Sequence, residues 1–535
     1  MTPSGHKRTA DSTAEEHTEK RNRHDRANLH PGVGFTPPPR HDGISEQNLS
    51  ARSHTPAGTL GTPAITMMVV AAAAPLTVLS GGTPLGILNG TGAGFPASFL
   101  IVGAALLLFS IGFAAMTRRV GGSGAFFNAI GHGLHPALGL GSSMLALFTY
   151  ATIQVGICCF LGMQITVCLE PLLGAATPWW AWSLAAIAIT GILGYRNIAM
   201  SAGVLNVLIA GEIGVALVLC VAVFAHHAPT GIDFASTFAP SAAFSGAPGV
   251  AVIFAIASFV GFESTAIYRS EARDPDVTVP RATYVAVVFV VLLYTASSFA
   301  IVTAWCTAAN TDTTAVLSAG NMLQITAERY VGGWFSTIVS MLIVTSLFAA
   351  VLSFHNVLAR YLQSMADARA LPSALGRVSA RRGSPTVASL ATTVISATIV
   401  VAVAVAGLDP FTQVFSWFSG VAVLGFVTLL VLTCVAVVVT FARRADLRVA
   451  EGPWRAIVAP AAGAVLLIAI LACSLMYFPH LVGELDATGT PAFGPICAVL
   501  VACAASALIA GVVEACIMRR ANTRAYRELE RALAR

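Results

Sequence analysis

The chain has 535 residues and a formal net charge of +5; 56% of its residues are apolar and 10% are charged. Because about a quarter of the residues of a soluble domain are charged, this composition excludes an ordinary soluble protein and predicts a polytopic membrane protein. Lysine occurs only at Lys7 and Lys20. The membrane part therefore has no phosphate-binding loop of the Gly-Lys-Ser/Thr type, which excludes an ATP-driven pump encoded on this chain.

The beginning of the chain, residues 1–60, is rich in His, Arg, Glu, Thr and Pro and has almost no apolar periodicity. Such a composition predicts a disordered head. Since no apolar stretch of the signal-peptide kind follows its basic start, we expect this head to stay in the cytoplasm.

Twelve apolar segments follow, each long enough to cross a bilayer as an α-helix. They span about residues 62–88, 97–117, 136–168, 178–195, 198–225, 247–268, 282–306, 333–366, 384–407, 411–441, 454–478 and 492–518. A short amphipathic piece over 124–134 precedes the third segment. We therefore predict an all-α fold with a transporter domain over 61–480, an outer loop and twelfth helix over 481–518, and a cytoplasmic tail over 519–535.

Basic residues concentrate in alternate loops. One side of the predicted membrane carries almost all loop arginines, among them Arg118, Arg273 and Arg443, and the other side carries Arg329 alone. The positive-inside rule then places both termini in the cytoplasm, in agreement with an even number of spans. The Ala-rich composition, with Arg in place of Lys, indicates a bacterial plasma (inner) membrane.

The sixth span is predicted to be interrupted near Gly261 and Glu263. An ionisable side chain and a glycine at mid-depth are tolerated only beside a protein-lined or watery cavity, because an unbroken helix in lipid satisfies its own backbone. Gly249 and Gly261 are twelve residues apart, or about 18 Å of helix, which is more than half of a hydrocarbon core of about 30 Å. Gly261 therefore lies near the midplane.

The first span has a second candidate interruption. Pro75 removes a backbone hydrogen bond and disfavours the helical conformation of Ala74, about 18 Å from the start of the span. Interruptions at similar depth, entered from opposite faces, are what an inverted repeat of five plus five helices predicts, with repeats over about 62–225 and 247–441. Pro75 alone is equally compatible with a kink, and Ser80-Gly-Gly-Thr-Pro84 is a second flexible point.

Two groups of residues resemble motifs of the amino acid–polyamine–organocation permease superfamily. Phe259-Val-Gly-Phe-Glu263, then Glu271-Ala-Arg-Asp-Pro275 and Val279-Pro-Arg-Ala282, resembles the family's sixth helix and the loop after it. Asn356-Val-Leu-Ala-Arg-Tyr-Leu-Gln-Ser-Met-Ala-Asp-Ala-Arg-Ala-Leu-Pro372, then Arg382-Gly-Ser-Pro385, resembles its loop between spans 8 and 9. The resemblance covers about residues 62–480. It implies a leucine-transporter-like fold with two extra helices, proton-coupled uptake or exchange of amino acids or amines, and substrate held between broken helices 1 and 6.

The chain departs from the family pattern at two places. Members usually carry Gly-Ser/Ala-Gly-Ile-Phe at the break of span 1, where this chain has Ala73-Ala-Pro-Leu-Thr77. Many members carry an acid near the end of span 2, where this chain has Met116-Thr117-Arg118. These differences indicate a divergent branch of the family.

The two broken helices supply the candidate substrate site. Free amides at the start of one half-helix attract a carboxylate, and free carbonyls at the end of the opposite half attract an ammonium. The assigned residues are Ala74, Pro75, Leu76 and Thr77 for the carboxylate, and Ala257, Ser258, Phe259, Val260 and Gly261 for the ammonium. Gate candidates are Phe254, Phe262, Trp417 and Arg360. Ordinary packing in apolar helices is the competing interpretation for the aromatic residues.

Two acids of the membrane part have no evident basic neighbour in the sequence. Glu263 directly follows the break of span 6, where its plain role is to hold unwound backbone by hydrogen bonds. Glu212 lies deep in span 5, about 21 Å from its cytoplasmic start. Because burial disfavours the charged form of a carboxyl group, Glu212 is the candidate for proton coupling, with a neutral structural hydrogen bond as the alternative.

Nothing in the sequence indicates a cofactor or an enzyme. The ten cysteines lie in or at the ends of apolar segments without paired metal-ligand spacing, which predicts small buried side chains and no metal. We see no HExxH, nucleophile elbow or phosphate loop, so no catalytic residue is assigned.

The leading prediction is a secondary transporter of amino acids that works by alternating access as a proton symporter. The alternatives are a cationic amine or polyamine carrier, an amino acid exchanger, and a non-transporting membrane sensor. The expected partners are an amino acid or amine, H⁺ and the lipid bilayer, without nucleic acid.

Overall fold

The computed structural model describes residues 60–120, 126–196, 202–263, 272–306, 313–367, 369–379, 383–521 and 526 of the chain. These residues belong to one compact unit. The predicted head up to residue 59, the end of the sixth predicted span with the first residues after it (264–271), and most of the predicted tail lie outside the described residues.

Helices account for most of the described residues. The long ones are α4 (Phe95–Val120), α6 (Pro136–Leu173), α7 (Trp179–Tyr195), α8 (Ala202–His227), α12 (Pro275–Trp305), α15 (Gly333–Asp367), α16 (Thr386–Val405), α17 (Ser416–Arg443), α19 (Ala459–Met476) and α21 (Pro495–Ala521). The short ones are α1 (Thr62–Ala72), α2 (Pro75–Thr77), α3 (Thr83–Gly86), α5 (Phe126–Gly133), α9 (Ala235–Phe238), α10 (Pro240–Ala243), α11 (Pro248–Ala257), α13 (Thr313–Ser318), α14 (Met322–Tyr330), α18 (Ala445–Glu451) and α20 (Phe478–Val482). Wider π-helical turns form η2 (Val78–Gly82), η3 (Ile87–Thr91), η8 (Pro410–Phe415) and η9 (Trp454–Val458).

Length and apolarity make this a multi-pass membrane protein. Among the described residues, nine helical stretches are long and apolar enough to cross a membrane, and α7 and α11 are shorter apolar helices. The first of the nine, Thr62–Arg118, contains the first two predicted spans. The third to fifth and the seventh to twelfth predicted spans correspond to α6, α7, α8, α12, α15, α16, α17, α19 and α21, and the amphipathic piece predicted over 124–134 is α5. Of the sixth predicted span, 247–268, the described part contains only the short helix α11. The prediction of an all-α polytopic protein is thus confirmed.

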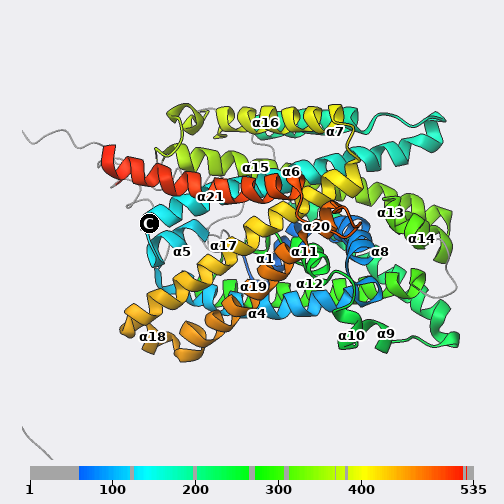
Figure 1. Cartoon of the computed structure of the whole chain (residues 1–535), viewed down its shortest axis with the longest axis horizontal. Helices are drawn as coiled ribbons and strands as arrows, with labels where there is room; N and C mark the ends of the chain where they lie inside the picture. Colours follow the sequence, from blue (N-terminus) through cyan, green and yellow to red (C-terminus); the bar gives the residue numbers. More distant parts are fainter. Residues whose placement is uncertain are drawn as a thin grey trace, which may run out of the picture. The chain divides into compact units, whose positions relative to one another are not determined.

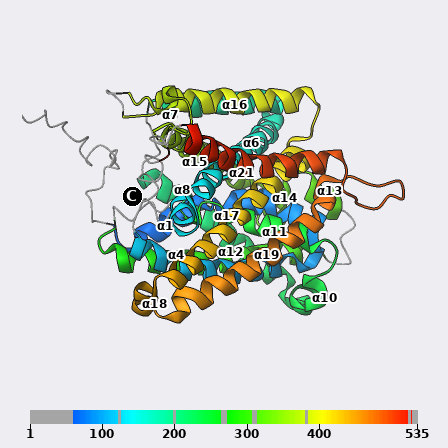
Figure 2. The same ribbon diagram turned by 60° about the vertical axis from the view of Figure 1, so that its left-hand side comes forward.

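The helices pack in two groups joined by α17. In one group α15 and α21 pack along α6, and α7 and α16 lie side by side at an edge (Figures 1 and 2). In the other group α4 packs against α12 and α19 (Figure 1). Helix α17 packs against both α6 and α19. Small residues allow the closest approach, since an added Cβ at Gly511 of α21 would lie 2.7 Å from the Cα of Gly141 in α6.

An ion pair holds the end of α4 against α18. A guanidinium nitrogen of Arg118 lies 2.7 Å from Oε2 of Glu451, and the two side chains are 20% and 5% exposed. Arg118 stands where many members of the resembled family have an acid, and here its acidic partner comes from a distant part of the chain. A largely buried acid that loses its basic partner is destabilising.

We therefore expect Arg118→Ala to lower the free energy of unfolding by about 2 kcal/mol, because Glu451 would lose this buried charge partner. Thermal unfolding in detergent measures the change. The matched control is Arg444→Ala, whose partner Asp446 lies 3.4 Å away with side chains 57% and 65% exposed. An exposed pair of this kind contributes at most about 0.5 kcal/mol. Equal losses in the two variants would contradict the assignment.

Candidate functional site

The first helical interruption lies at Ala74. Helix α1 ends at Ala72, and α2 begins at Pro75, which occupies its first turn. Ala74 between them is left-handed, with φ 45° and ψ 71°. The interruption predicted at Ala74 and Pro75 is thus confirmed. The rival point over Ser80–Pro84 stays helical, as the wider turn η2 and the start of α3.

An alanine in the left-handed region costs about 1–2 kcal/mol through contact of its Cβ with the backbone. We therefore expect Ala74→Gly to stabilise the protein by up to about 1 kcal/mol, after the greater flexibility of glycine in the unfolded chain is subtracted. The control is Ala104→Gly, at an exposed position inside α4, which should destabilise by about 1 kcal/mol. Thermal unfolding distinguishes the two signs, and a loss at both positions would contradict the strain at Ala74.

The second interruption follows α11. This helix ends at Ala257, and the backbone continues in turns, with Phe259 donating to the carbonyl of Ile256 and Val260 to that of Ala257. Gly261 has φ 106°, a backbone conformation that residues other than glycine rarely adopt. The interruption predicted at this glycine is confirmed.

The two interrupted helices lie against each other. An added Cβ at Gly82 of η2 would lie 3.8 Å from the carbonyl oxygen of Phe254 and 4.0 Å from Oγ of Ser258. Farther along, Ala247 before α11 donates to the carbonyl of Gly90 in η3, at 2.9 Å. The part of the first interrupted helix that follows Ala74 therefore runs along α11.

The segments on the other side of the interruptions also meet. The amide of Arg273 donates to the carbonyl of Leu60 at 3.0 Å. Around this contact Ile65 of α1 forms a small buried cluster with Ala272 and Val279. The start of the first span is thus packed against the segment that leads into α12.

Glu212 reaches the first interruption from α8. Its Oε2 accepts a hydrogen bond of 3.1 Å from the amide of Leu76, and the residue is 5% exposed. Ser346 of α15 lies beside this carboxyl group, and its hydroxyl is 3.4 Å from that of Thr77. From α12, the hydroxyl of Tyr294 donates to the carbonyl of Ala73 at 2.9 Å. Three helices therefore converge on the point where α1 is broken.

Glu263 holds the second interruption. Its Oε2 accepts from the amide of Gly261 at 2.9 Å, and its Oε1 accepts from the hydroxyl of Tyr150 in α6 at 2.5 Å. The hydrogen bond to unwound backbone that the sequence predicts for Glu263 is present. Neither Glu212 nor Glu263 forms an ion pair with a described residue.

The gate candidates lie in different surroundings. Phe254 is buried against Gly82 of the other broken helix. Phe262 points into an aromatic cluster, with ring centroids 5.8 Å from Phe109 and 6.3 Å from Phe426, which is packing between helices. Trp417 is buried in α17.

Two further predicted residues lie in different surroundings. Arg360 is exposed on α15 and has no ion pair with a described residue. Phe259, in the assigned ammonium stretch, is buried with its ring 6.2 Å from that of Tyr294.

Several residues of the site are missing from the sequence prediction. They include Tyr150, Tyr294 and Ser346, which reach the interruptions from other helices. They also include an aromatic stack in which the Phe160 ring lies 5.0 Å from the rings of both Phe411 and Phe415. This stack borders η2, because an added Cβ at Gly81 would lie 2.8 Å from the ring of Phe415.

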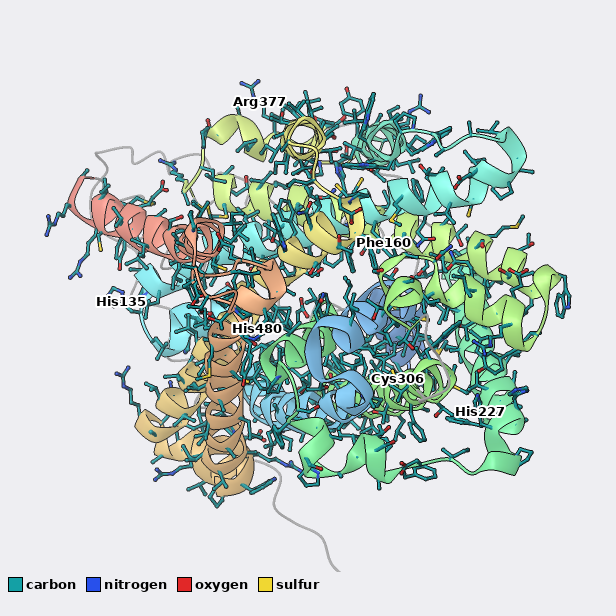
Figure 3. All side chains as sticks on the ribbon, turned by 45° about the vertical axis from the view of Figure 1, so that its right-hand side comes forward. His135, Phe160, His227, Cys306, Arg377 and His480 are labelled. Atoms are coloured by element: carbon teal, nitrogen blue, oxygen red, sulfur yellow. The ribbon has the colours of Figure 1, made fainter. Side chains whose placement is uncertain are left out.

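Figure 3 shows Phe160 in the interior of the bundle, whereas Arg377 lies at its periphery.

Gln154 is a polar residue within an apolar span, and this is the feature by which the sequence points to it. Its side chain is 1% exposed on α6, one turn after Tyr150, and neither amide atom has a hydrogen-bond partner among the described residues.

The sequence comparison agrees with this geometry. The family model described as amino acid permease matches residues 60–511, a range that contains both interruptions and both buried acids. No curated protein matches the chain.

Proposed function

The chain belongs to the amino acid permease family, and on that premise we propose that it carries amino acids across the plasma membrane by alternating access. The observation that carries the proposal is the pair of interrupted helices packed against each other around Ala74 and Gly261. Interrupted helices leave backbone amides and carbonyls free, and transporters bind their cargo at such points.

We assign twelve transmembrane helices to the protein, ten of them in two inverted repeats over about 62–225 and 247–441. Both termini lie in the cytoplasm in this arrangement. The support is the pair of interruptions, one in the first and one in the sixth span, together with the arginine-rich loops between alternate spans.

The cargo carboxylate binds at the start of the half-helix that follows Ala74, where Leu76 and Thr77 supply the first amides after Pro75. The cargo ammonium binds at the carbonyl end of α11, around Ala257 to Gly261. The support for both is electrostatic, since a helix start favours negative charge and a helix end favours positive charge.

Glu212 couples transport to protons. It is buried, it touches the first interruption, and no described residue forms an ion pair with it. A carboxyl group at this place can bind and release a proton, and its charge changes a hydrogen bond at the cargo site. Phe254 and Trp417 are assigned to the gates, and Arg360 to the cytoplasmic entrance.

The test is counterflow in proteoliposomes loaded with proteinogenic L-amino acids, with labelled amino acids outside. We expect labelled amino acid to enter only vesicles that contain the protein. A matched pair of variants ties the activity to the interruption. Gly261→Ala, at φ 106°, should abolish counterflow, whereas Gly231→Ala, at φ 87° in a loop with no atom near the added Cβ, should retain it. Absence of counterflow for every amino acid and amine would overturn the proposal.

A cationic amine carrier is the second candidate. The observation that favours it is the hydrogen bond from Leu76 to Glu212, because the first amide of the carboxylate site already has an acceptor in the protein. Competition by amines alone in the same counterflow assay would establish this alternative.

A further inference from the structure

We propose that Glu212 and the cargo carboxylate compete for one backbone amide, that of Leu76, so that a proton and a carboxylate-bearing cargo bind together. The inference rests on the proposed function and specifies how its cargo and its coupling ion are linked. It starts from a contact across 136 residues of sequence, in which Oε2 of Glu212 accepts from Leu76 at 3.1 Å.

Few amide donors are available at this interruption. Pro75 has no N–H, and Ala74 provides no side-chain cap. The amide of Val78 already donates to the carbonyl of Ala74 at 3.3 Å. Two amides remain, those of Leu76 and Thr77. The Leu76 amide donates to Glu212. No hydrogen bond of the Thr77 amide to another described residue is observed. A cargo carboxylate that accepts from both amides at the start of this half-helix therefore needs, besides the Thr77 amide, the Leu76 amide that Glu212 holds.

The hydrogen bond to Glu212 also shows that the Leu76 amide can donate to a carboxylate group. The amide lies in a buried region, where Leu76 is 0% and Glu212 5% exposed. Hydrogen bonds from an N–H to an ionised carboxylate are about twice as strong as those to neutral acceptors. An ionised Glu212 therefore excludes a second carboxylate from the same donor by both occupancy and charge.

Protonation of Glu212 reverses this preference. The proton enters from water on the open side and bonds to a carboxylate oxygen, which makes Glu212 neutral and weakens its hold on the Leu76 amide. The cargo carboxylate then takes the hydrogen bond. The interruption holds one negative charge in both states, on Glu212 without cargo and on the cargo when it is bound, so no second buried charge is created.

No basic side chain among the described residues forms an ion pair with Glu212, so a proton is the positive charge that neutralises its carboxylate. Helix α15 presents the Ser346 hydroxyl, and α2 presents the Thr77 hydroxyl. Helix α12 presents Tyr294, a titratable group close enough to interact with Glu212.

Amines provide the discriminating comparison, because an amine without a carboxylate does not compete for the Leu76 amide. The probes are L-alanine, L-leucine and L-arginine with their decarboxylated forms ethylamine, isopentylamine and agmatine, used as competitors of counterflow at about pH 7.5 and about pH 5.5. For an amino acid that the carrier accepts, we expect competition to strengthen about tenfold or more at the lower pH, since each pH unit is worth up to a factor of about ten. The matched amine should show no such increase.

Glu212→Gln should make competition by the amino acid independent of pH, because the amide side chain does not titrate. Glu514→Gln on α21 is the control, and it should keep the full pH dependence. The comparison of amino acid with amine uses the unmodified protein, so it remains decisive if the Glu212 variant fails to fold.

Two results would overturn the inference. One is an equal pH effect on amino acid and amine, and the other is an unchanged pH dependence in Glu212→Gln. In both cases counterflow itself persists, whereas failure of the proposed function would remove counterflow for all probes.

Discussion

Glu212→Gln is expected to abolish accumulation of cargo driven by a pH gradient while counterflow continues. Glutamine keeps the size of the side chain and an oxygen that accepts from Leu76, but it binds no proton. A gradient of about one pH unit stores about 1.4 kcal/mol per proton, which supports about tenfold accumulation. In the variant the inside and outside concentrations should become equal. Uptake into proteoliposomes with an acidic exterior measures this ratio.

The control for this experiment is Glu514→Gln, which removes a carboxyl group from α21, outside the convergence of α8, α12 and α15. It should accumulate cargo as the unmodified protein does. Full accumulation by Glu212→Gln would show that the proton is carried elsewhere and that Glu212 has only a structural hydrogen bond. Loss of counterflow together with accumulation would instead indicate that Glu212 is needed to hold the first interruption.

Tyr150→Phe is expected to lower the free energy of unfolding by about 2 kcal/mol, because one buried oxygen of the Glu263 carboxyl group would lose its hydrogen-bond donor. The hydroxyl of Tyr150 lies 2.5 Å from Oε1 of Glu263, and that acid in turn holds the amide of Gly261 at 2.9 Å. The loss should therefore also reduce the rate of counterflow, since the unwound segment would no longer be fixed. Thermal unfolding and counterflow are measured on the same preparations.

A double-mutant cycle separates the pair from general packing. In Tyr150→Phe/Glu263→Ala both partners of the hydrogen bond are gone, and each single variant already breaks that bond, so the double variant should be less destabilised than the sum of the two single variants. Tyr477→Phe is the matched control, because its ring contacts His480 and its hydroxyl has no hydrogen bond with a described residue. Additive effects in the cycle would contradict the contact between Tyr150 and Glu263.

Local sequence was sufficient for the membrane class, for the long apolar helices and for the two interruptions. Run length and apolarity specify a transmembrane helix without reference to the rest of the chain, because a lipid-exposed backbone must satisfy its own hydrogen bonds. Pro75 and Gly261 act in the same local way. A proline cannot donate in a helix, and glycine alone accepts φ 106° without strain.

The partners of these residues were decided by tertiary structure. Glu212 meets Leu76 across 136 residues and Tyr150 meets Glu263 across 113, and no local pattern specifies such pairs. In a soluble helix the polar face shows which side is exposed, whereas spans apolar on every side do not reveal which face points inward. For this reason Phe262 was a reasonable gate candidate from its position beside Gly261, yet its ring packs with Phe109 and Phe426. The sequence by itself determined where the helices run and break, and only their rotation and packing decided which side chains close the site.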